Sequence, residues 1–228
     1  MKPVIFSGEM VKAILEGRKT QTRVAVKPRN KKKAKQLEYR QGYGLWVNGY
    51  DDGYIGEREA NGIIKDYTVS PMWMDLDAYI GKYAPYKPGD VLYVREAFWV
   101  HKNDPLDCYK NIIYDADYCD GHKTPDRWLP QWYSRKPSIR MPKAAARIYL
   151  RVVDVRVERL REITVQDACN ELGKDYVVTG NLGADIAIME LDLNAFVSLW
   201  DNLNAKRGYT WESNPWVWKI VFERVKKS

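Results

Sequence analysis

The chain has 228 residues, 45% of them hydrophobic, which is enough to build one elaborated domain around a full core. Its 37 Lys and Arg residues outnumber its 30 Asp and Glu residues, and the formal net charge of +7 favours polyanionic partners such as nucleic acid. The sequence lacks an apolar stretch long enough to cross a bilayer, an N-terminal secretory pattern and a cysteine framework. These features argue against a membrane protein and against a small disulfide-rich secreted protein. They predict a cytoplasmic protein without a membrane partner.

The first predicted elements are a short strand over residues 3–6 and a helix that Ser7 caps and that runs to Glu16. Two apolar pairs one turn apart place a hydrophobic stripe on one face of this helix. Gly17 then occupies the position where a left-handed residue commonly ends a helix. We therefore expect the segment from Gly17 to Arg23 to form the turn after the helix.

Two long irregular stretches, over residues 27–88 and 102–143, are interpreted as insertions. The first is polar and rich in Gly and Tyr, and we expect a hairpin near residues 46–54. The second is rich in proline and contains a short strand near residues 112–114. Between the two insertions, a turn leads into residues 91–99, whose β-branched and aromatic side chains predict a strand.

The C-terminal part alternates between strands and helices. Residues 147–156 alternate as a strand does, and Thr164 begins a helix that ends at Gly173. Apolar spacing from Leu193 onward predicts a second helix, and residues 216–225 predict a last strand. This order predicts a single α+β domain over residues 1–228, built on a small β-barrel with flanking helices and the two insertions.

Four segments in this order resemble the ASCH family, and they cover about two thirds of the chain. Gly17, Lys19 and Arg23 match the family pattern G-x-K-x-x-x-R directly after the first helix. The turn at residues 87–90 with its following strand, the stretch from 147 to 162 and the closing strand match as well. The layout is similar to that of longer ASCH proteins of bacteriophages and prophages, which would place the chain in the cytoplasm of a bacterial host.

The resemblance implies a PUA-like fold and a cleft that accepts nucleic acid, RNA above all, or a modified nucleoside. The family is related to bacterial N4-acetylcytidine amidohydrolases, in which a Lys, a Thr and a Glu form the catalytic set. The matching residues are Lys19, Thr22 and Glu171, with Glu96 as the alternative carboxylate. In this chemistry a threonine hydroxyl must lose its proton to a nearby base, and we expect a neutral Lys19 to take it.

Basic residues near the motif are the predicted contacts for nucleic acid. These are Arg18, Lys19, Arg23, Arg29, Lys31 and Lys32. The run that contains the last three could follow a phosphate backbone, although a solvated flexible loop is the simpler interpretation and the one we favour. A basic loop that caps a helix C-terminus is the corresponding structural alternative for Lys19 and Arg23.

Two further groups lie in or near the second insertion. His101, Cys108, Cys119 and His122 are spaced too irregularly for a standard zinc site, so we predict no metal and no cofactor. Trp99, Trp128, Trp132 and Tyr133 could form a stacking wall for a base, or could pack beneath the insertion.

Two other functions remain open from the sequence. One is a binding module without turnover, and the other is a phage accessory protein that binds a host protein through its insertions. The substrate and the oligomeric state are not determined by the sequence.

Overall fold

The computed structural model describes residues 1–27, 81–101, 112–118, 129–175 and 179–226, and the backbone of two short strands over 37–40 and 44–47. The chain divides into two compact units, one formed by Met1–Ala25 and Tyr86–Ser228 and the other by Val26–Pro85. In the smaller unit, β3 (Leu37–Arg40) pairs antiparallel with β4 (Gly44–Val47). This hairpin begins earlier in the chain than the one expected at 46–54, whose residues 48–54 lie outside the described part.

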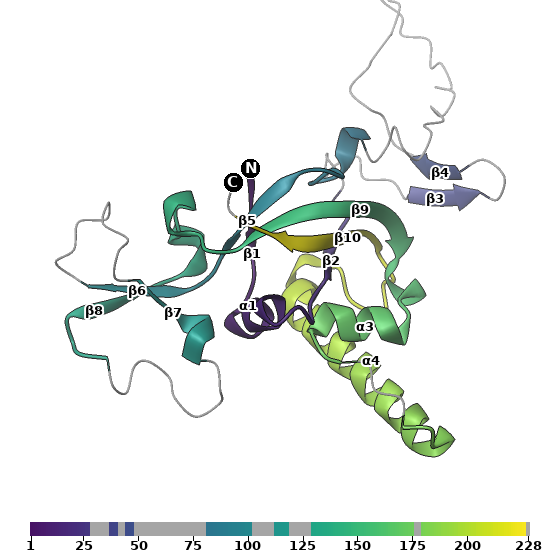
Figure 1. Ribbon diagram of the computed structural model, residues 1–228. Helices are drawn as coiled ribbons and strands as arrows, with labels where there is room; N and C mark the ends of the chain where they lie inside the picture. Colours follow the sequence, from purple (N-terminus) through teal and green to yellow (C-terminus); the bar gives the residue numbers. More distant parts are fainter. Residues whose placement is uncertain are drawn as a thin grey trace, which may run out of the picture. The chain divides into compact units, whose positions relative to one another are not determined.

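The larger unit is built on a five-stranded mixed sheet in the order β1-β5-β9-β10-β2 (Figure 1). Its strands are β1 (Lys2–Ile5), β2 (Gln21–Ala25), β5 (Val91–Arg95), β9 (Tyr149–Arg159) and β10 (Trp216–Val225). The pair β1–β5 is parallel and the other pairs are antiparallel. The two long strands β9 and β10 pair over most of their length, with one irregularity between Val221 and Phe222.

The predicted α+β class is therefore confirmed, because this sheet combines with separate helices. The predicted closed barrel is not confirmed. Among the described strands, β1 and β2 stand at opposite ends of the sheet order and no ladder joins them.

Three helices lie on one face of the sheet, α1 (Gly8–Leu15), α3 (Val165–Leu172) and α4 (Leu182–Asn204) (Figure 1). The expected caps are present: the Ser7 and Thr164 hydroxyls accept from the backbone N–H groups three residues later. Gly173 ends α3 with φ at 71°. Helix α4 begins earlier than its apolar spacing predicts, because the Asn181 side chain caps it at Ala184.

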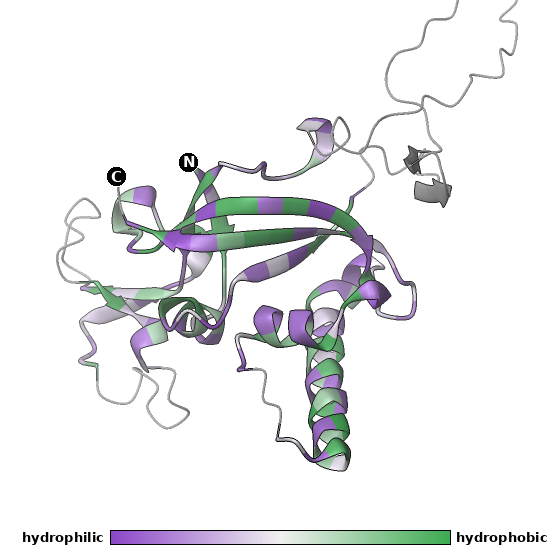
Figure 2. Ribbon diagram, turned by 45° about the vertical axis from the view of Figure 1, so that its right-hand side comes forward, coloured by the Kyte–Doolittle hydropathy of each residue, from purple (hydrophilic) through white to green (hydrophobic). Residues whose placement is uncertain are grey.

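One cluster of the hydrophobic core lies between the sheet and the helices α3 and α4. It includes Leu160, Ala168, Phe196, Trp200 and Val217, all buried. Figure 2 shows hydrophobic and hydrophilic residues interspersed along α4 and along the long strands β9 and β10.

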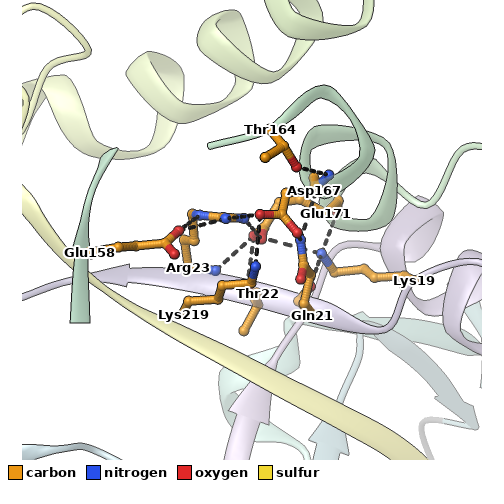
Figure 3. Close-up of polar contacts among 9 residues, drawn as sticks. All are labelled: Lys19, Gln21, Thr22, Arg23, Glu158, Thr164, Asp167, Glu171 and Lys219. Carbon is orange, nitrogen blue, oxygen red and sulfur yellow. Dashed lines mark hydrogen bonds and ion pairs between the residues drawn. The ribbon is translucent and has the colours of Figure 1, made fainter. Parts of the chain in front are cut away.

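Strand β2 replaces the turn that the sequence predicts. Gln21, Arg23 and Ala25 are buried and alternate with the half-buried Thr22 and Val24. Two of the three buried positions are polar, so the alternation cannot be recognised from hydrophobicity. The segment after α1 therefore belongs to the sheet, and the side chains of Gln21 and Arg23 point toward α3 (Figure 3).

The strand predicted over 91–99 is divided in two. After β5, the chain leaves the main sheet at Glu96 and Ala97, and β6 (Phe98–His101) joins a second sheet. This second sheet has the order β7-β6-β8, with β7 (Ile113–Tyr114) and β8 (Tyr133–Lys136) on either side of β6. The polar sequence of β8 explains why no strand was expected there.

Within the described residues, no helix combines the length and the apolar character that crossing a bilayer requires.

Candidate functional site

Figure 3 shows a compact cluster of charged and polar side chains where β2 passes beneath α3. We call it the α3 cluster, and its charged members are three cations and three carboxylates: Lys19, Arg23, Lys219, Glu158, Asp167 and Glu171. Glu171 and Asp167 stand one turn apart on α3, and the other members come from β2, β9, β10 and the chain just before β2. The fold thus assembles groups that are up to about 200 residues apart in the chain.

Arg23 lies at the centre of the cluster, and its side chain has 0% exposure. Its Nε donates to Glu158 Oε1 at 2.8 Å, and its Nη2 donates to Asp167 Oδ2 at 3.0 Å. Nη1 lies 3.5 Å from Glu171 Oε2. Three carboxylates therefore surround one guanidinium, which satisfies the planar donor group on several sides.

The free edge of β2 is covered by two side chains. β2 is the terminal strand of the sheet, so one of its edges has no partner strand among the described residues. Glu171 Oε1 accepts from the Arg23 backbone N–H at 2.9 Å, and Lys19 Nζ donates to the Gln21 carbonyl at 2.9 Å. These contacts take the place of a neighbouring strand and attach the end of α3 to the sheet.

Lys19 is 2% exposed and is held by backbone carbonyls. Besides Gln21, Nζ donates to the carbonyl of Glu171 in the last turn of α3, where cations are favoured. Burial lowers the Lys19 pKa, the Glu171 charge raises it and the Arg23 charge lowers it, with a net decrease. A neutral amine still has the two N–H groups that these two carbonyls need, so the geometry accommodates both protonation states.

Thr22 is half-buried on β2, and its hydroxyl donates to Glu171 Oε1 at 3.1 Å. The Lys19 ammonium lies 3.8 Å from the same carboxylate oxygen. The described residues show no hydrogen bond between Thr22 and Lys19. The group that accepts the hydrogen bond of the threonine hydroxyl is therefore the Glu171 carboxylate, whereas the sequence predicted Lys19 in that position.

Asp167 connects the other side of the cluster. It accepts from Lys219 at 2.7 Å and from the Gln21 side chain at 3.1 Å, in addition to Arg23. Desolvation raises the Asp167 pKa. The hydrogen bonds from Lys219 and Gln21 and the charge of Arg23 lower it by more, so the pKa of Asp167 is below its ordinary value. This carboxylate therefore stays ionised at neutral pH.

Sequence reasoning missed Asp167, Glu158, Lys219 and Gln21. A signal existed for Asp167, because it precedes Glu171 by four residues and so shares its helix face. No local pattern marks Glu158 or Lys219, which reach the cluster only through the pairing of β9 and β10 with β2.

The predicted nucleic-acid contacts separate into three groups. The side chains of Lys19 and Arg23 are 0% exposed and their charges are paired within the α3 cluster, so neither presents an exposed cation to a phosphate in this structure. Arg18 is partly exposed and donates to Glu16. Arg29, Lys31 and Lys32 lie outside the described residues, and their role stays a prediction.

The alternative carboxylate, Glu96, belongs to a different cluster. It is 1% exposed and accepts from Arg147 Nε at 2.9 Å and Nη2 at 3.0 Å. Arg147 also contacts Asp117 at 2.8 Å and lies over the Tyr114 ring at 3.9 Å. We call these four residues the Arg147 cluster. Of the two candidate carboxylates, Glu171 is the one that contacts Thr22.

The metal and stacking candidates are only partly described. His101 packs edge-on against Tyr133, and Cys108, Cys119 and His122 lie outside the described residues. The described residues contain no group of metal ligands. Trp99 is buried and its indole donates to Asp115 at 2.6 Å, so its face cannot stack on a base. Trp132 is 55% exposed, and Trp128 is not described.

Comparisons with protein families, with curated proteins and with solved structures found no match to this chain. The ASCH resemblance therefore stays a prediction from the sequence motifs.

Proposed function

We propose that this chain is a cytoplasmic ASCH-type, PUA-like domain that binds nucleic acid or a modified nucleoside and removes an acyl group from a modified cytosine. The observation that carries the proposal is the contact of one carboxylate, Glu171, with both Thr22 and Lys19, at 3.1 Å and 3.8 Å. These are the three residues that the family resemblance implies as a catalytic set. Glu171 is separated from the other two by about 150 residues of sequence, so their meeting is not a local effect.

In the proposed reaction, Thr22 Oγ1 attacks the acyl carbon while Glu171 Oε1 accepts the hydroxyl proton. The tetrahedral intermediate then loses the cytosine amine: the bond from carbon to N4 breaks, and the proton on Glu171 passes to the departing nitrogen. Water then attacks the acyl carbon of the threonine ester while Glu171 takes a proton from it. The bond from that carbon to Thr22 Oγ1 breaks, Glu171 returns the proton to Oγ1, and the carboxylic acid is released. Lys19 is a positioning residue, because its charge and its backbone contacts hold Glu171 against β2.

The test is hydrolysis of N4-acetylcytidine and a panel of other acylated nucleosides by the purified chain, followed by chromatography of the products. Thr22→Val and Glu171→Gln should each lower kcat by about 100-fold or more, the range typical for a lost acid–base group. Thr20→Val is the matched control, because Thr20 is exposed and lies on the same segment. If the wild type forms no more product than Thr22→Val on every substrate, the enzyme proposal is wrong.

A binding module without turnover is the second candidate, and the burial of Lys19 favours it. An amine that donates to two carbonyls beneath α3 has the contacts of a structural cap. In that case nucleic acid or a nucleoside binds but no substrate in the panel is hydrolysed.

A further inference from the structure

Residues 129–148 form the most strongly basic segment in the described chain. This segment includes β8 and contains five basic residues and no acidic one: Arg135, Lys136, Arg140, Lys143 and Arg147. In contrast, the stretch 175–205, which includes α4, contains five acidic residues and no basic one: Asp175, Asp185, Glu190, Asp192 and Asp201. Among the described residues, the positive charge of this segment is therefore locally concentrated, which favours the binding of anions.

The segment combines β8 with two short 3₁₀ helices, Ser138–Arg140 and Lys143–Ala145, and contacts with the rest of the chain hold it in place. Met141 is fully buried beside Phe98 and Ala145, and its sulfur accepts from the Glu96 backbone N–H at 3.3 Å. Arg95 donates to the Ile139 carbonyl, and Tyr114 donates to the Ala145 carbonyl at 2.9 Å. Such a surface is already arranged before a ligand binds, which lowers the entropic cost of binding.

Three of the five cations are available to an external anion. Arg135 is paired with Asp115, and Arg147 is paired with Glu96 and Asp117. The side chains of Lys136, Arg140 and Lys143 make no ion pair with any residue that the structure describes. Arg140 and Lys143 are exposed and Lys136 is half-buried.

An exposed aromatic ring accompanies these cations. Trp132, directly before β8, is 55% exposed, and Ile139 on the same segment is 65% exposed. Trp132 lies in the turn that precedes β8, and Lys136 is the last residue of that strand. Flat aromatic faces beside spaced cations are the features that bind single-stranded nucleic acid with little sequence preference.

We propose that Trp132, Lys136, Arg140 and Lys143 form a contact surface for single-stranded nucleic acid, with a base stacked on Trp132 and phosphates on the three cations. This surface rests on the nucleic-acid part of the proposed function but not on the hydrolysis. It replaces Lys19 and Arg23 as phosphate contacts, since those two side chains are buried. It also accounts for an exposed tryptophan that the core does not use.

The test is the binding of a labelled single-stranded polyuridine oligonucleotide to the full chain, measured by fluorescence anisotropy over a series of salt concentrations. In the variant K136Q/R140Q/K143Q, the slope of log K against log salt should decrease by about 2, since each single-strand phosphate contact contributes about 0.7. Trp132→Ala should weaken binding about tenfold and leave the slope unchanged.

The matched control, K206Q/R207Q/K226Q, removes three exposed cations elsewhere and should keep the wild-type slope. Circular dichroism checks that all variants fold. If the control lowers the slope as much as the first variant does, net charge explains the binding and the proposed surface is wrong. Binding of duplex as tightly as single strand, with no effect of Trp132→Ala, also overturns it.

Anionic phosphatidylserine vesicles provide the competing polyanion. Vesicle binding that depends on the same residues, without oligonucleotide binding, assigns the surface to lipid and contradicts the proposal. If the wild type binds no oligonucleotide, the nucleic-acid part of the proposed function fails together with the surface. Hydrolysis of free acylated nucleosides should persist in every variant of this series, so failure of the surface and failure of the enzyme remain distinguishable.

Discussion

The α3 cluster and the Arg147 cluster bury opposite charges. In the α3 cluster, the Lys19 and Arg23 side chains are 0% exposed, and the three carboxylates around them are between 8% and 18% exposed. In the Arg147 cluster, the carboxylate of Glu96 is 1% exposed and the guanidinium of Arg147 is 26% exposed. The most strongly desolvated charged groups are therefore cations in the α3 cluster and an anion in the Arg147 cluster.

This difference determines how each cluster responds to pH and to mutation. Desolvation disfavours the charged form, so it lowers the pKa of Lys19 and raises the pKa of Glu96. The bonds from Arg147 and its charge oppose the shift of Glu96, and the charges of Asp117 and Asp115 add to it. Removing the fully buried partner of a pair leaves other buried charges uncompensated, whereas a partly exposed partner can be replaced by water.

The largest effect should come from removing the central cation of the α3 cluster. Arg23→Met leaves Glu158, Asp167 and Glu171 without their shared partner and should cost about 3–5 kcal/mol of unfolding free energy. Arg147→Met leaves one buried carboxylate, Glu96, without its partner instead of three, and water can reach the space of the removed guanidinium because Arg147 is 26% exposed, so its cost should be smaller. Urea unfolding of both variants measures the difference, and an equal or larger loss in Arg147→Met would contradict this comparison.

A smaller loss is expected where α3 approaches the Lys19 segment. Gly173 has φ at 71°, and a Cβ atom there would lie 2.2 Å from the Ala13 Cβ and 3.3 Å from the Lys19 Cβ. Gly173→Ala should therefore cost about 3 kcal/mol, from backbone strain and overpacking together.

Gly17→Ala is the control for that substitution, since its φ is 80° but a Cβ there meets no atom within 4 Å. The loss of unfolding free energy in Gly17→Ala should therefore come from backbone strain alone. Equal losses in the two variants, measured by urea unfolding, would show that the close approach to Ala13 has no energetic role.

The pH dependence of the α3 cluster should lie on the alkaline side. The folded pKa of Lys19 is below its ordinary value of 10.5, so the unfolded state holds more protons between these two values. The free energy of unfolding therefore rises with pH in that window, by at most about 1.4 kcal/mol per pH unit. Lys19→Met should lack this rise in urea unfolding at alkaline pH, whereas Lys206→Met at an exposed site should keep it. A wild-type curve parallel to that of Lys19→Met would contradict the expectation.

The Arg147 cluster should show the smallest effect, with the opposite sign and on the acid side. The folded pKa of Glu96 is raised above 4.5, so the folded state holds more protons between 4.5 and that value. Stability contributed by this group is present below 4.5 and is lost as pH rises through the folded pKa. Glu96→Gln should remove this decrease. Urea unfolding of the wild type and of Glu96→Gln from acid to neutral pH measures this dependence. If the free energy of unfolding falls with pH equally in both, a group other than Glu96 causes the decrease.

Local sequence signals predicted the elements whose cause is local. The hydroxyl caps at Ser7 and Thr164, the left-handed Gly173 and the final strand all depend on a few neighbouring residues, and the structure confirms them. The proximity of Glu171 to Lys19 and Thr22 was expected only from the family resemblance. No spacing in the sequence joins residue 171 to the first helix.

Tertiary structure alone decided what surrounds those residues. Strand β2 went unrecognised because Gln21 and Arg23 fill its buried face, and a buried polar side chain is stable only when distant partners such as Glu158 and Asp167 reach it. The packing of α3 over β2 also placed Glu171, instead of Lys19, against the Thr22 hydroxyl. Local propensity acts over a turn of chain, whereas desolvation and charge pairing depend on which strands and helices pack together.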